Sequence, residues 1–176
     1  MKVVFEPRRT FTKINGMKNN VQNIKLTVAS LMVLVASSLS AQSLNPNWNS
    51  ELKTSLQEFL SCQNSGDAKA WTRFLGESLQ TVYKVNDFYS HKSGRYMGVG
   101  EIASFLKTSK QWSQLGHAYE QDILLKAQDQ ANAKKAVVAL YMNEAGIGHV
   151  VAITPGKVQR SGSWGLDVPN AASFFA

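Results

Sequence analysis

The sequence predicts an α+β fold, with helices in the first half of the domain and a small antiparallel sheet in the second. Apolar residues recur at helical spacing in several segments before residue 135. Two short runs rich in β-branched residues follow, AVVALYM at 136–142 and HVVAITP at 149–155, and we expect both to be strands. NEAGIG between them has the glycines of a hairpin turn, which predicts antiparallel pairing.

The first 41 residues have the pattern of a secretory signal peptide. An uncharged apolar run, LTVASLMVLVASSLSA at 26–41, follows two lysines and ends in small residues that suit signal peptidase. It is shorter than the roughly 20 residues that span a bilayer. We therefore expect cleavage after Ala41, with Met17 as an alternative start, and a secreted or periplasmic protein. An uncleaved membrane anchor is the alternative.

The positive charge of the chain is concentrated in this leader. The whole chain carries a formal net charge of +7, but residues 1–41 hold six of its 19 basic residues and one of its 12 acidic residues. The remainder therefore carries about +2, and its longest basic run is Lys134-Lys135. This distribution argues against a nucleic-acid partner. Once the leader is removed, we expect no association with a membrane.

The mature part begins with the polar stretch QSLNPNWNS at 42–50, which we predict to be a linker before a single domain at 51–176. A first helix is predicted over 51–61 and a second from Asp67 to about Lys84. Their apolar positions at helical spacing are Leu52, Leu56, Phe59, Leu60, Trp71, Phe74, Leu75, Leu79 and Val82.

The remaining segments alternate between loops, helices and short strands. The chain ends on an apolar stretch, VPNAASFFA, which is unusual for a soluble protein. Two alternatives remain, a complete chain and a chain truncated at its C-terminus. The predicted elements are a loop at 89–98, a helix at 99–109, a turn or short strand at 110–119, a helix at 120–135 and a third strand within 157–166.

Gly148-His149, followed by an apolar strand and preceded by a helix, resembles the papain-like cysteine amidases and peptidases of the NlpC and CHAP types, which hydrolyse bacterial cell walls. The resemblance covers roughly residues 55–170, with SGSWG at 161–165 as weaker support. It implies a papain-like α+β fold and a peptidoglycan stem peptide, or a related amide, as substrate. In that family a cysteine at the start of a helix is the nucleophile, and the histidine takes its proton.

Carried onto this chain, the resemblance makes His149 the general base and Gln159 the residue that orients its ring. Cys62 is the only cysteine and therefore the candidate nucleophile. Trp164 and Ser163 are candidate contacts to substrate, because the glycines beside them allow a close approach to the backbone. A Cys-His mechanism of this kind would need no cofactor.

The position of the nucleophile leaves two alternatives open. The family's Asp-Cys pattern at the helix start aligns with Asp67-Ala68, so an alanine stands where the cysteine is expected, and Cys62 lies six residues earlier. Either Cys62 folds back beside His149, or it is a small apolar filler and the protein holds a glycopeptide or protein ligand without cleaving it. A structural protein of an unrelated α+β fold is a third interpretation.

Other chemistry has little support in the sequence. His91 lies in a polar loop, and His117 has only a few apolar neighbours in the sequence. No pair of histidines or cysteines has the spacing of metal ligands, and no phosphate-binding or dinucleotide-binding glycine motif is present. We therefore predict no metal and no cofactor.

Overall fold

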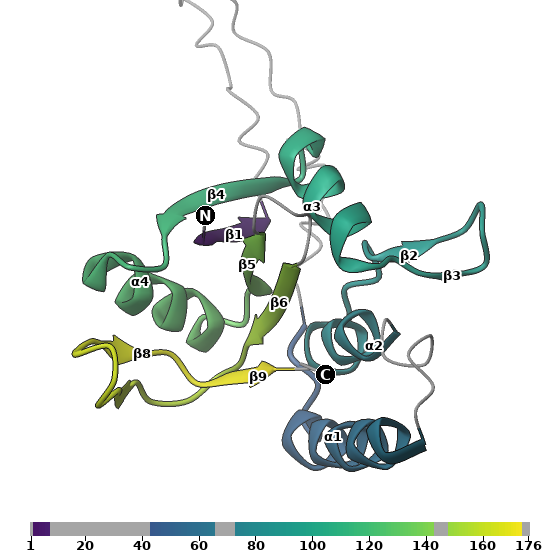
Figure 1. Cartoon of the computed structure of the whole chain (residues 1–176), viewed down its shortest axis with the longest axis horizontal. Helices are drawn as coiled ribbons and strands as arrows, with labels where there is room; N and C mark the ends of the chain where they lie inside the picture. The colour runs from purple at the N-terminus through teal and green to yellow at the C-terminus, as the bar shows by residue number, and fades with distance from the viewer. Residues whose placement is uncertain (1, 8–42, 66–72, 143–147, 174–176) are drawn as a thin grey trace, which may run out of the picture. The chain divides into compact units, whose positions relative to one another are not determined.

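A five-stranded sheet forms the centre of the fold (Figure 1). Its strands lie in the order β4-β1-β5-β6-β9, and every neighbouring pair is antiparallel. The strands are β1 (Lys2–Pro7), β4 (Trp112–His117), β5 (Val137–Met142), β6 (Gly148–Ile153) and β9 (Ala171–Ser173).

The structure is a computed structural model that describes residues 2–7, 43–65, 73–142 and 148–173. These residues all belong to one compact unit, and their mixture of helices and antiparallel sheets confirms the predicted α+β class. Two small two-stranded sheets pair β2 (Tyr89–Ser90) with β3 (Arg95–Tyr96) and β7 (Gln159–Arg160) with β8 (Asp167–Val168). The helices are α1 (Trp48–Ser65), α2 (Arg73–Tyr83), α3 (Val99–Thr108) and α4 (Gln121–Asn132).

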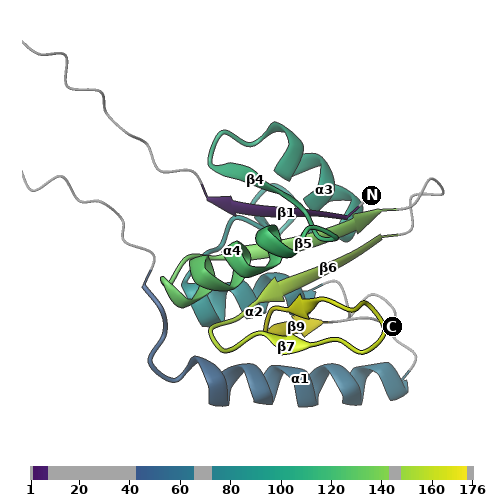
Figure 2. The same ribbon diagram turned by 90° about the vertical axis from the view of Figure 1, so that its left-hand side faces the viewer.

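Helices cover both faces of the central sheet (Figure 2). Side chains alternate between the two faces of a strand, so Val150 and Val151 of β6 enter different layers. Val150 packs in the cluster that includes buried residues of α1, α2 and α3, whereas Val151 packs against the cluster built on α4. Both faces of β5 are buried in the same way, with Val138 in the first cluster and Val137 in the second.

The segment predicted as a linker packs against the domain. Asn45 is buried, its amide N–H donates to the Val82 carbonyl at 2.9 Å, and its side chain donates to Glu51 Oε2 at 2.8 Å. Trp48, three residues before the predicted start of the first helix, is already helical and packs on the core. The polar composition of this segment therefore did not reveal that it is fixed to the domain by hydrogen bonds.

The predicted helices at 51–61, 99–109 and 120–135 and both predicted strands are confirmed, with small shifts of their ends. The second helix is described from Arg73; its predicted start and the turn at 143–147 lie outside the described residues. The predicted loop at 89–98 contains the β2–β3 pair. The predicted third strand within 157–166 is confirmed as β7, but it pairs with β8 in a separate sheet, and the strand that pairs with β6 is β9.

The first residues of the chain take part in the sheet. Sequence patterning assigned Lys2–Pro7 to the removable leader, whereas the structure places this segment as β1, between β4 and β5. A cut after Ala41 would separate β1 from the rest of the domain. Among the described residues, no helix has the length and apolar character needed to cross a membrane.

Candidate functional site

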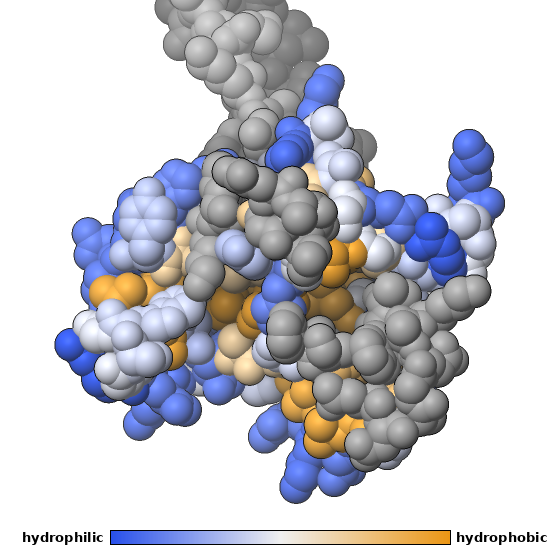
Figure 3. Space-filling view, in the orientation of Figure 1, coloured by the Kyte–Doolittle hydropathy of each residue, from blue (hydrophilic) through white to orange (hydrophobic). Residues whose placement is uncertain are grey.

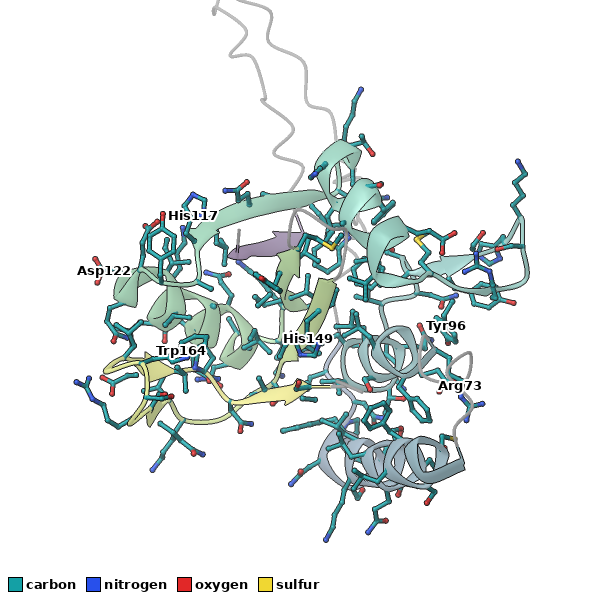
Figure 4. The ribbon with its side chains drawn as sticks, in the orientation of Figure 1. Arg73, Tyr96, His117, Asp122, His149 and Trp164 are labelled. Atoms are coloured by element: carbon teal, nitrogen blue, oxygen red, sulfur yellow. The ribbon has the colours of Figure 1, made fainter. Side chains whose placement is uncertain are left out.

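His149 lies at the beginning of β6, one residue after the strand opens at Gly148. It shares a face of the sheet with Val151 and Ile153, which pack in the cluster of α4, whereas Val150 faces α2 and α3. The side chain is half-buried at the open end of the strand. In Figure 4 it lies on β6 near the short strand β9.

The imidazole of His149 has a defined hydrogen-bond partner. Its Nε2 lies 2.8 Å from Oγ of Ser173, the last described residue of β9. The register explains the contact, because Ser173 is directly opposite Val151 and His149 is the next residue along on the same face. Tyr141, the cross-strand neighbour of His149 on β5, is partly exposed and borders the pair.

Burial sets the protonation state of this histidine. Partial removal from water lowers the pKa of His149 below its ordinary value of 6.5. The ring is therefore neutral at neutral pH, with one nitrogen able to donate a hydrogen bond and the other able to accept one. A neutral, held imidazole can act as a general base or as a hydrogen-bonding group for a ligand.

Gly148 explains why a glycine precedes the histidine. A Cβ at this position would lie 2.7 Å from Val99 Cγ1 and 2.8 Å from the Tyr141 carbonyl oxygen, and would also meet Met142 Sδ. Such distances are too short for real carbon contacts, so only glycine lets β6 approach β5 and α3 this closely. The glycine thus fixes the backbone from which His149 projects.

Cys62 lies in the last turn of α1, where it is partly buried. That end of a helix presents carbonyl groups, whereas the amide end is the one that stabilises thiolates. α1 contributes to the cluster on the α2 side of the sheet and packs mainly against α2. Because His149 faces the opposite side of the sheet, the structure does not bring Cys62 and His149 together.

The other predicted site residues also lie elsewhere. Gln159 is exposed on β7, in a different sheet from His149, so the orienting residue that the structure gives is Ser173. Ser163 and Trp164 are exposed in the turn between β7 and β8. Figure 4 shows Trp164 beside α4, apart from His149.

The turn that carries Trp164 is internally hydrogen-bonded. Ser161 N–H donates to the Leu166 carbonyl at 2.8 Å, and Gly165 N–H donates to the Ser161 carbonyl at 3.0 Å. Trp164, Leu125 and Tyr119 are each exposed on neighbouring elements. In Figure 3 pale and orange side chains interrupt the hydrophilic surface on this side of the molecule.

Asp67 and Ala68, the predicted nucleophile position, lie outside the described residues. His91 is exposed in the β2–β3 turn, and the ring of His117 stacks on that of Tyr119 with centroids 5.1 Å apart. Within the described ranges, no three His, Cys, Asp or Glu residues group as a metal-ion site.

Sequence reasoning missed Ser173. The stretch AASFF was interpreted only as an apolar chain end, although the burial of Ala172 between exposed Ala171 and Ser173 is the alternation of a strand. Three residues were too few to reveal that period. The pairing of this strand with β6, which brings Ser173 to His149, has no signal in the local sequence.

Scans against protein-family models, curated proteins and solved structures found no match to this chain.

Proposed function

We propose that the chain is an exported binding module, related in arrangement to the papain-like amidases, that holds a peptide or glycopeptide without cleaving it. The observation that carries this proposal is the half-buried His149–Ser173 pair on one face of the sheet, with Cys62 in the helical layer of the other face. A held imidazole without a thiol beside it binds a ligand but has no nucleophile of its own.

The chemistry of the pair suits an amide ligand. A neutral imidazole and a hydroxyl can each accept or donate a hydrogen bond, as the carbonyl and N–H groups of a peptide require. The ring of Tyr141 adds a partly exposed aromatic surface at the same end of the sheet. The resemblance to cell-wall amidases indicates a peptidoglycan stem peptide as the ligand class.

Binding of defined muropeptides tests this proposal. Disaccharide tetrapeptides purified from peptidoglycan would be titrated into the protein by calorimetry, with His149→Ala and Ser173→Ala as variants. Loss of one hydrogen bond worth about 1 kcal/mol should weaken binding about fivefold. His91→Ala, a histidine change in an exposed turn, is the matched control and should leave binding unchanged. Equal affinities for all four proteins, or no binding by the parent protein, would contradict the proposal.

Hydrolysis through Cys62 is the outcome that would overturn this proposal, because it needs the thiol beside His149, whereas α1 packs on the other side of the sheet. The rate of Cys62 alkylation against pH, with and without His149→Ala, decides between the two. A binding module gives the same alkylation profile in both proteins. Rapid alkylation at about pH 6 that His149→Ala abolishes would establish a catalytic dyad instead.

A further inference from the structure

The strand β1 fills a space between two strands that do not otherwise meet. β1 pairs with β4 through Val3 and His117, and with β5 through Lys2 and Tyr141. Since β1 is antiparallel to both neighbours, β4 and β5 run parallel to each other. Two strand spacings separate them, about 9.5 Å in all, which is too far for direct hydrogen bonds.

β4 is held in place by contacts that do not involve β1. At its start, the indole of Trp112 is buried, stacks on Phe88 with centroids 5.3 Å apart, and donates to Asp87 Oδ2 at 2.7 Å. Near its end, Gly116 lies so close to Ile123 of α4 that a Cβ there would be 2.6 Å from the Ile123 side chain. These contacts fix β4 at both ends.

The facing edge of β5 is equally fixed. β5 pairs with β6 along its whole length, from Val137 opposite Ile153 to Met142 opposite Gly148. Its side chains are buried on both faces of the sheet, Val138 on one and Val137 on the other. Without β1, the backbone groups of β4 and β5 that face each other would have no partner in a largely apolar setting.

The segment Lys2–Pro7 has the composition of a strand in the middle of a sheet. Its centre, Val3-Val4-Phe5, is an uninterrupted apolar run. Strands that are buried on both faces contain apolar runs of this kind. In strands with one face exposed to solvent, apolar and polar residues alternate. A proline at position 7 ends the strand, where its missing N–H costs no interior ladder bond.

We propose that β4 and β5 form a strand-acceptor groove for the chain's own segment Lys2–Pro7, and that this segment stays bound as a strand after the chain is cut between residues 8 and 42. The bound state is an added strand, held by main-chain hydrogen bonds on both sides. Cleavage of a leader after Ala41 would be one such cut. The retention of this segment is independent of what the His149 site binds.

A cut full-length chain tests the proposal. The full chain, with a site-specific protease sequence inserted after Asn15, would be made by cell-free translation without membranes, cut, and passed over a sizing column. Mass spectrometry of the protein peak should find the N-terminal fragment bound to the rest. Loss of the fragment from the cut parent chain overturns the proposal, whether or not the remainder stays folded.

A proline variant localises the effect in the uncut chain. Val4→Pro removes one amide donor from the interior of the strand, and Asn15→Pro is a control outside it. Hydrogen exchange in Val4→Pro should rise by tenfold or more at those amides within Ser113–Gly116 and Val138–Leu140 that face β1, and should stay slow at the amides that pair β6 with β9. Exchange in β4 and β5 that is the same in both variants would also overturn the proposal.

Discussion

Gln128 of α4 is a buried polar side chain whose removal should have a measurable cost. Its Nε2 donates to the Thr154 carbonyl at 3.0 Å and to Asn132 Oδ1 at 3.2 Å, and its Oε1 accepts the Asn170 N–H at 2.7 Å. Only 3% of the residue is exposed. Gln128 therefore connects α4 with the segment after β6 and the segment before β9.

The variant Gln128→Met keeps the length of the side chain and a similar helix propensity, but it leaves two backbone groups without their partner. Each buried unsatisfied group costs about 1–3 kcal/mol, and the added apolar burial returns about 1 kcal/mol. The net loss of unfolding free energy should be about 3 kcal/mol, within a range of about 1–5 kcal/mol. For a chain of this size, the melting temperature should fall by about 5–10 °C.

Thermal unfolding followed by circular dichroism measures this shift. Gln57→Met is the matched control, because Gln57 is exposed on α1. It should change the melting temperature by less than about 2 °C, as expected for a surface substitution. If Gln128→Met were as stable as Gln57→Met, then Gln128 would not be the partner on which Thr154 and Asn170 depend.

Three further predictions concern the strand that carries His149. Tyr83→Phe removes the hydroxyl that donates to the Ile153 carbonyl at 2.8 Å in the core. The free energy of unfolding in urea should therefore fall by about 1–2 kcal/mol. An unchanged urea midpoint would show that the hydrogen bond is not formed. Gly148→Ala should destabilise the domain by about 1–3 kcal/mol, because the added Cβ would be too close to its neighbours. Gly100→Ala, which has open space around its Cβ position, is the control and should be neutral or slightly stabilising. A lower melting temperature for Gly100→Ala than for Gly148→Ala would contradict this account. The pKa of His149 is lower in the folded state than its ordinary value of 6.5, so the unfolded chain takes up the proton first and stability is lost as the pH falls below about 6.5. His149→Gln should reduce that loss between about pH 7.5 and pH 5, and a parent protein with the same pH dependence would exclude a lowered pKa.

The sequence predicts most of the secondary structure because the signals are local. The apolar periodicity of α4 and the β-branched runs of β5 and β6 follow from single elements, and these three elements were predicted correctly. Lys2–Pro7 was assigned to the leader because its neighbours in sequence are basic and apolar. Its place between β4 and β5 depends on residues more than 100 positions away, for which local patterns carry no information.

The same reasoning explains what was missed at the candidate site. Gly148 and His149 stand out locally, and the structure gives both a defined role in the geometry of β6. Ser173 and Cys62 could be related to His149 only through sheet order and the face on which each helix packs. Neither property is encoded in a short stretch of sequence, so the orienting residue was sought on the nearer strand, at Gln159.

The position of β1 also has a consequence for the timing of folding. The strand that is synthesised first has partners, β4 and β5, that are synthesised more than 100 residues later, which gives the sheet a high contact order. On the ribosome, Lys2–Pro7 therefore has no native strand to pair with until His117 and then Met142 have emerged. The central sheet therefore cannot be completed until more than two thirds of the chain has been synthesised.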